Sequence, residues 1–127
     1  MSKHVAIWMD HKEARVFALS AESVDEKTVL ASAHDIQHKH PHQGKGAHDH
    51  PEEHQRFFHE VAEAVQHADE ILVVGPGFAK LEFIRHLHKH SPLIEEKVVG
   101  VETVDHPTDN QIVAYAKKSF TWIDRMT

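Results

Sequence analysis

Histidine is the residue type whose number and spacing in this sequence most directly suggest chemistry. The chain has 127 residues and 15 histidines, eight of them between residues 34 and 59. Imidazole nitrogens bind zinc, nickel and copper, so closely spaced histidines can hold such a metal. The sequence contains no cysteine, and histidines one residue apart do not form a zinc-finger pattern. A zinc or nickel site would draw its ligands from two alternating runs in the segment 34–50: His38, His40, His42, His48 and His50.

The same histidines limit what the net charge says about binding partners. The chain has 20 acidic side chains and 14 lysines and arginines, which gives a formal net charge of −6 at pH 7. A protein that binds nucleic acid mainly by electrostatics is usually basic, so this balance disfavours that class. Histidine titrates near pH ~6.5, however, and mild acidification would cancel the negative charge. Phosphate binding would therefore require positive charge gathered on one surface.

The hydrophobic pattern predicts the elements that position these residues. The segment 34–50 has no hydrophobic period and contains proline and glycine, so it is predicted to be a long loop. Helical spacing of apolar residues predicts helices over 51–68, 78–90 and 108–120. Short apolar or alternating runs predict strands over 4–9, 14–19, 27–33, 70–74 and 97–104.

The order β-β-β-α-β-α-β-α predicts a single α/β domain over residues 1–127 with an RNase H-like fold. The right-handed crossover rule gives a mixed five-stranded sheet of order 3-2-1-4-5, covered by three helices. Ligands of such sheets bind at the carboxyl ends of the parallel strands, where helix N-termini also present backbone N–H groups to anions. The residues that follow those strand ends are predicted to share one functional edge: Lys12, Gly75, Gly77, Lys80 and His106.

Two segments resemble a known family. Residues 70–83, EILVVGPGFAKLEF, combine a buried strand with a GPGF turn, a lysine and a helix start. This pattern resembles the middle domain of Pelota and of the archaeal and eukaryotic class one release factors. Residues 7–17, IWMDHKEARVF, also resemble the small bacterial relatives described as translational machinery proteins. The resemblance covers nearly the whole chain and implies an RNase H-like fold and binding to the ribosome or tRNA, in translation or ribosome rescue.

The family's catalytic tripeptide is not present in this sequence. Release factors carry Gly-Gly-Gln in the loop before the first helix, where it helps water attack peptidyl-tRNA. Here that loop reads HQGKG over residues 42–46. Pelota also lacks the tripeptide, so the resemblance implies a non-hydrolytic binding protein without catalytic residues. Its expected contacts with the ribosome or tRNA are Lys12, Gln43, Gly44, Lys45, Gly46, Gly75, Gly77, Lys80 and His106.

Other functions stay open at this point. The loop histidines could make a metal-binding or metal-dependent hydrolytic protein. A two-metal nuclease would need carboxylates on neighbouring strands, for which Asp10 is a candidate with Glu60 or Glu63 on the first helix, and Asp105 is a substitute for the partner that the end of strand 70–74 lacks. Asp10 and Asp105 are each followed by a histidine, His11 and His106, so either pair could act as general acid and base, or simply form a turn. A purely structural subunit is a further alternative.

The remaining aromatic residues and histidines are expected to have structural roles. Histidines near the end of helix 78–90, namely His86, His88 and His90, are expected in solvent, where they complement the helix dipole. The sequence has no apolar run of roughly 18 residues and no signal-peptide pattern, so we expect a cytoplasmic protein. Six aromatic residues have core-like spacing: Trp8, Phe17, Phe57, Phe58, Phe83 and Phe120.

Overall fold

A computed structural model describes residues 3–31 and 52–126 of the chain. Each predicted strand and helix has a counterpart in it, whereas the predicted loop 34–50 lies outside the described residues. The helices are α2 Glu52–Ala64, α3 Ala79–His90, α4 Pro92–Glu95 and α5 Asp109–Met126. The strands are β1 His4–Met9, β2 Glu13–Leu19, β3 Val24–Leu30, β4 Glu70–Gly75 and β5 Val98–Thr103.

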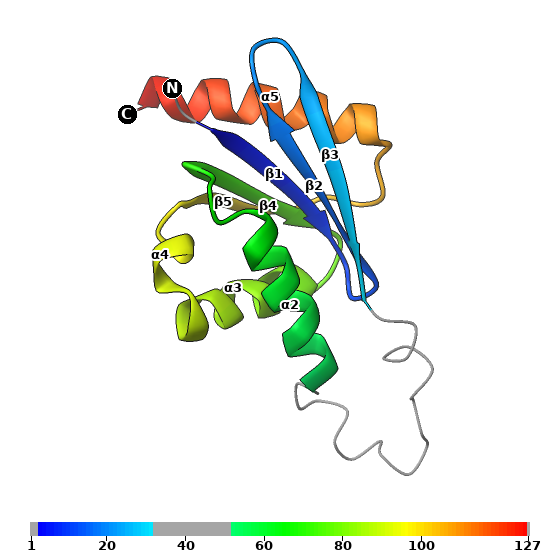
Figure 1. Cartoon of the computed structure of the whole chain (residues 1–127). Helices are drawn as coiled ribbons and strands as arrows, with labels where there is room; N and C mark the ends of the chain where they lie inside the picture. The colour runs from blue at the N-terminus through cyan, green and yellow to red at the C-terminus, as the bar shows by residue number, and fades with distance from the viewer. Residues whose placement is uncertain (1–2, 32–51, 127) are drawn as a thin grey trace.

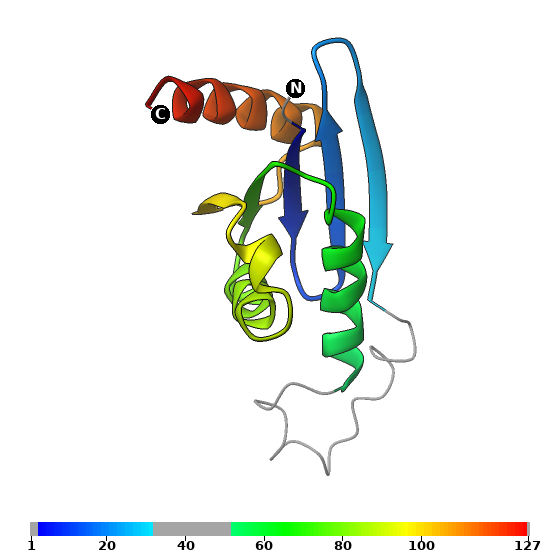
Figure 2. The same cartoon turned by 60° about the vertical axis from the view of Figure 1, so that its left-hand side comes forward.

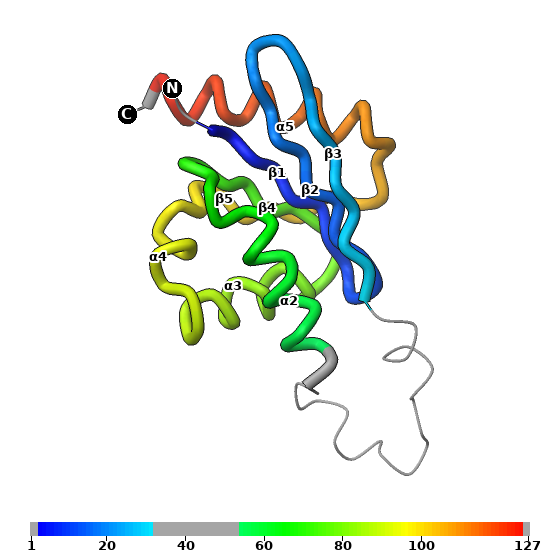
Figure 3. Tube along the Cα trace, in the orientation of Figure 1, coloured from blue at the N-terminus to red at the C-terminus, as the bar shows by residue number. Residues whose placement is uncertain are grey.

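The strands form one sheet of order β3-β2-β1-β4-β5, which confirms the predicted order and the RNase H-like fold. Strand β1 lies in the middle, antiparallel to β2 and parallel to β4, as the chain trace shows (Figure 3). Strand β5 continues the sheet parallel to β4, and β3 continues it antiparallel to β2. The carboxyl ends of β1, β4 and β5 consequently meet at one edge.

Helices cover both faces of the sheet and enclose two hydrophobic cores (Figures 1 and 2). Because side chains alternate along a strand, Ile7 packs toward α2 and α3, while Trp8 packs toward α5. Burial on both sides explains why β1 and β4 read as nearly continuous apolar runs. The predicted core aromatics are all buried: Trp8, Phe17, Phe57, Phe58, Phe83 and Phe120.

Element boundaries differ from the prediction at two places that matter below. Strand β3 covers Val24–Leu30 rather than 27–33, because it pairs with the whole of β2 although its own sequence is polar. The last helix continues beyond residue 120 to Met126. Its buried side chains follow four-residue spacing, and Asp124 stands one step beyond Phe120 in that series. The one-turn helix α4 was not predicted.

Candidate functional site at the carboxyl ends of the strands

Three contacts assemble the loops at the carboxyl ends of β1, β4 and β5. The backbone N–H of Val104 donates to the carbonyl of Gly75 at 3.1 Å, which joins the loop after β5 to the end of β4. The indole Nε1 of Trp8 donates to the carbonyl of Asp105 at 2.9 Å. In the turn after β1, His11 Nε2 lies 3.0 Å from Glu82 Oε1 in the first turn of α3. The topology therefore brings the predicted edge together as one surface.

The two glycines of the Gly-Pro-Gly turn have different roles. A Cβ placed on Gly75 would lie 2.1 Å from the carbonyl oxygen of Met9, so only glycine lets β4 approach β1 here. A Cβ placed on Gly77 would meet nothing within 4 Å, and neither residue has a positive φ. Gly75 is thus a packing requirement, whereas Gly77 leaves exposed backbone that a binding partner can approach.

Lys80 lies inside this turn rather than on its surface. Its side chain is buried, with only 5% of the residue exposed, and its Nζ donates a hydrogen bond to the carbonyl of Gly77. The aliphatic stem of lysine tolerates such burial, while the ammonium needs an acceptor. In this arrangement Lys80 braces the turn, and a contact of its ammonium with phosphate stays a prediction.

Among the described residues of the predicted set, Lys12 is an exposed cation at this edge. It lies in the β1–β2 turn, where Asp10 Oδ1 accepts the backbone N–H groups of Lys12 at 2.8 Å and Glu13 at 3.0 Å. In this Asx-type arrangement Asp10 forms the turn, which is the structural alternative given for the Asp10-His11 pair in the sequence analysis. The side chain of Lys12 is left at the surface of the edge.

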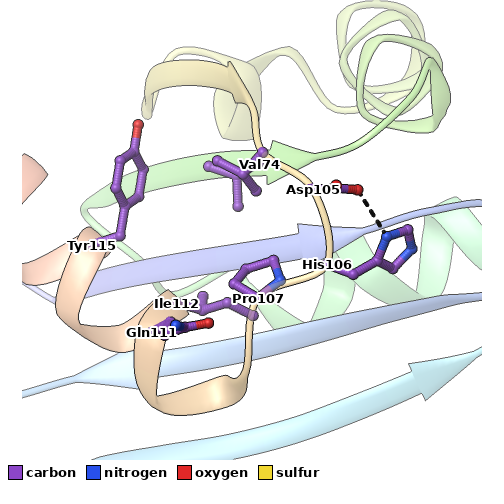
Figure 4. A pocket seen from close by; sticks show the side chains of 8 residues that line it. Val74, Asp105, His106, Pro107, Gln111, Ile112 and Tyr115 are labelled. Carbon is purple, nitrogen blue, oxygen red and sulfur yellow. Dashed lines mark hydrogen bonds and ion pairs between the residues drawn. The ribbon is translucent and has the colours of Figure 1, made fainter.

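A pocket of about 480 Å³ opens beside His106 (Figure 4). The ring of His106 packs at 5.3 Å against that of Trp8, and its Nδ1 lies 3.1 Å from Asp105 Oδ1. Both side chains of this pair are largely exposed, so the pair lies in a solvent-screened environment that does little to activate a general base. The pocket is lined by Val74, Val104, Asp105, His106, Pro107, Gln111, Ile112 and Tyr115.

Trp8 is the buried support of this region. Its ring contacts His106 on one side, and the Cζ of Arg15 lies 5.2 Å from its ring centroid. Arg15 in turn pairs with Glu13 at 3.0 Å and with Asp109, the first residue of α5, at 2.8 Å. These contacts fix the start of α5 and the loop before it against β1 and β2.

Phe78 is a surface residue of the edge that the sequence analysis did not single out. It precedes α3, follows the open Gly77, and is 72% exposed. Its backbone caps α3 without a side-chain hydrogen bond. An exposed aromatic ring beside open backbone and a helix N-terminus is a surface suited to contacting another molecule. The sequence feature that could have identified Phe78 as a surface residue is its position in the GPGF turn, directly after Gly77.

Among the described residues, charge at this edge is mixed rather than strongly basic. The exposed Lys12 is accompanied by the carboxylates of Asp10, Glu82 and Asp105.

The remaining predicted contacts and the predicted metal ligands lie outside the described residues. These are Gln43, Gly44, Lys45 and Gly46, and the histidines His38, His40, His42, His48 and His50. The described residues that flank the segment lie at the same edge. The N–H of Ala31 donates to the carbonyl of Lys12 at 2.9 Å, and the ring of His54 lies 5.8 Å from that of His11.

The expectation that His86 is solvated is wrong, whereas His88 and His90 are exposed as expected. The ring of His86 lies between that of Phe58 at 5.7 Å and that of His90 at 4.7 Å. Its Nε2 is buried and has no hydrogen-bond partner among the described residues. Burial, followed by the neighbouring His90 and His59, lowers the pKa of His86 to about 4.

The sheet order and the two helical layers define an RNase H-like α/β domain. Among solved structures, Pelota of Archaeoglobus fulgidus shares this fold with a TM-score of 0.65 and 19% identity, over 92% of this chain and 31% of that one. The archaeal translation termination factor aRF1 matches with a TM-score of 0.62 and 17% identity, over 91% of this chain and 34% of that one.

A sequence relative points to the same proteins. The Pelota homologue of Methanocella arvoryzae is 40% identical over 50 residues, which are 37% of this chain and 14% of that protein. The resemblance to the Pelota and release-factor domain is therefore confirmed. The chain spans about a third of the length of the two solved structures and a smaller share of the length of the Methanocella arvoryzae protein. No protein-family model matches it, and no helix among the described residues is long and apolar enough to cross a membrane.

Proposed function

We propose that this domain is a non-hydrolytic, translation-related factor that binds the ribosome or tRNA through the carboxyl-end edge of its sheet. The observation that carries the proposal is the likeness to Pelota, which extends over 92% of the chain in fold and includes a segment of 40% sequence identity. The non-hydrolytic part rests on the order of residues 42–46, HQGKG, which lacks the Gly-Gly-Gln tripeptide.

The exposed residues of the edge supply suitable contacts for RNA. Lys12 can pair with a phosphate, and Phe78 can stack on a base or pack on a protein surface. His106 is exposed beside the pocket, where its ring can donate or accept a hydrogen bond. Lys45 and its neighbours Gln43, Gly44 and Gly46 belong to the segment whose flanking residues reach this edge, so we include them in the proposed surface.

Co-sedimentation with purified ribosomes tests the proposal. The wild-type chain should pellet stoichiometrically at low salt, less at moderate salt, and more at pH 6.5 than at pH 7.5. Lys12→Glu and Phe78→Ser should each weaken binding about fivefold or more, equivalent to about 1 kcal/mol per contact. Both side chains are exposed, so the fold should be retained. Lys118→Glu makes the same charge reversal on the exposed side of α5 and should bind like the wild type.

Two results would contradict the proposal. Absence of pelleting at every salt and pH would remove direct ribosome binding, and a parallel titration with tRNA would then decide whether any RNA is bound. Equal weakening by Lys118→Glu and Lys12→Glu would indicate attraction without a defined surface. Release of labelled peptide from peptidyl-tRNA on ribosomes would overturn the non-hydrolytic part alone.

A further inference from the structure

Three potential metal ligands converge at the end of the sheet opposite to the candidate site. His4 begins β1 and Glu70 begins β4, and the parallel register places these two residues directly opposite each other. Asp124 lies in the last turn of α5, one helical step beyond the buried Phe120. Residues far apart in the sequence thus meet because two strands start side by side under the end of one helix.

The distances between the ligand atoms fit a tetrahedral metal ion. His4 Nε2 lies 3.1 Å from Asp124 Oδ2 and 3.4 Å from Glu70 Oε1. One ligand atom from each of the three residues falls within 4.8 Å of the other two. Ligands bound to tetrahedral zinc at 2.0–2.1 Å are separated by about 3.3 Å. The distances from His4 Nε2 to Asp124 Oδ2 and to Glu70 Oε1 are therefore close to the ligand–ligand distance of a tetrahedral zinc site.

The Oε1 atom of Glu70 is buried and makes no hydrogen bond among the described residues, although it lies within ion-pair distance of His4 Nε2. A buried carboxylate oxygen without a hydrogen bond is costly. A divalent cation held between His4, Glu70 and Asp124 would bind this oxygen.

We propose that His4, Glu70 and Asp124 form a binding site for a divalent transition-metal ion, with Zn²⁺ as the best match. One imidazole and two carboxylates suit zinc, whereas magnesium and calcium prefer oxygen ligands alone. With three protein ligands, zinc keeps a fourth position for water or another ligand. His4 and Asp124 also line a pocket of about 590 Å³, together with Lys117 and Phe120, which gives such a ligand access.

The proposed site uses none of the histidines in the segment 34–50, and it lies at the opposite end of the sheet from the proposed ribosome- or tRNA-binding edge. Its three ligands come from β1, β4 and α5, so an ion there would fasten the last turn of α5 to the start of two central strands. Metal binding to the native state alone stabilises a fold by mass action. We therefore expect Zn²⁺ to raise the thermal midpoint of unfolding through this site.

The loop histidines would obscure a direct titration, so the test uses a full-length background in which five of them are asparagine. This background carries His38→Asn, His40→Asn, His42→Asn, His48→Asn and His50→Asn. Calorimetric titration with Zn²⁺ should show one site per chain, and the imidazole NMR resonances of His4 should shift upon binding. Adding Asp124→Asn or Glu70→Gln should weaken Zn²⁺ affinity by at least about tenfold, the loss that even outer-shell changes at metal sites typically cause.

Glu63→Gln supplies the matched control. His59 Nε2 and Glu63 Oε2 lie 3.4 Å apart on the exposed side of α2, and this pair does not belong to the three-ligand group. The control should keep the affinity and the thermal shift of the background. Equal Zn²⁺ binding by the background and by both site variants, or unchanged His4 resonances, would overturn the proposal. Circular dichroism identifies any variant that fails to fold, and the His4 resonances of the background decide the question in that case.

Discussion

The indole N–H of Trp8 donates to the backbone carbonyl of Asp105 at 2.9 Å, which ties the middle of the sheet to the loop before α5. Trp8 is 1% exposed, and its ring also contacts His106 and the guanidinium of Arg15. One buried side chain therefore supports both the rim of the pocket and the start of the last helix. The shape of the proposed RNA-binding edge depends on this support.

Trp8→Phe should lower the free energy of unfolding by about 1–3 kcal/mol, through the lost hydrogen bond and the cavity left by the smaller ring. Urea unfolding followed by circular dichroism measures the change. Trp122→Phe is the matched control because Trp122 is 63% exposed, and it should change the free energy by less than about 0.5 kcal/mol. Equal effects of the two substitutions would contradict the role given to Trp8.

The two glycines of the GPG turn should respond differently to alanine. Gly75→Ala forces a methyl group against the Met9 carbonyl and should cost about 2 kcal/mol or more of stability, since both strands are in the core. Gly77→Ala meets open space and should leave stability within about 0.5 kcal/mol. Urea denaturation of the two variants gives the comparison. If Gly77 serves only a binding partner, Gly77→Ala should impair ribosome binding without loss of stability.

Lys80 should tolerate an apolar replacement better than an acidic one. Lys80→Met retains much of the buried stem and should cost about 1 kcal/mol, whereas Lys80→Glu buries an unpaired carboxylate and should cost about 3–5 kcal/mol. Thermal unfolding of both variants tests this order. A fully folded Lys80→Glu variant would show that the side chain can reach solvent, as its predicted phosphate contact requires.

His86 should make the domain less stable in acid. The folded-state pKa of about 4 lies below the ordinary histidine pKa of 6.5, so the unfolded chain takes up the proton first. The stabilising contribution of neutral His86 is therefore fully present above pH 6.5 and is lost as the pH falls toward 4. His86→Leu removes this titration, and the difference in unfolding free energy between pH 7.5 and pH 5 should shrink by about 1 kcal/mol after allowance for solvent screening.

His88→Asn is the control for that measurement. His88 is 77% exposed at its side chain and its Nδ1 lies 3.0 Å from Glu95 Oε1. Its replacement should leave most of the acid sensitivity in place. An unchanged pH dependence in His86→Leu would show that His86 finds solvent or a partner in the folded protein.

The fold could be predicted where the hydrophobic pattern of a segment follows directly from its burial. The apolar run in Glu70–Gly75 is required for a strand covered on both faces, and the crossover rule then orders the sheet. The predicted strand 27–33 begins three residues after the start of β3, Val24–Leu30. The cause is that pairing with β2, rather than an apolar sequence, makes this segment a strand. The apolar pattern predicts the end of the last helix at residue 120, whereas α5 continues to Met126 and includes Asp124.

The site was harder to predict because side-chain direction depends on neighbours distant in the sequence. A glycine that faces Met9 cannot be told from one that faces open space by the motif GPG alone. Lysine is usually a surface residue, yet the side chain of Lys80 is buried and its ammonium donates to the carbonyl of Gly77. Part of the proposed metal site can be predicted from the sequence, because His4 and Glu70 begin adjacent parallel strands.

The polar sequence of the outermost strand also affects how molecules meet each other. Among the described residues, strand β3 has a neighbouring strand on one side only, and it exposes Asp25, Glu26 and Lys27. An unpaired edge can recruit a second chain and extend the sheet, and charged side chains oppose that addition. A crowded solution of this domain is therefore expected to resist strand-by-strand assembly into fibres at β3, even though the neighbouring β2 is rich in apolar residues.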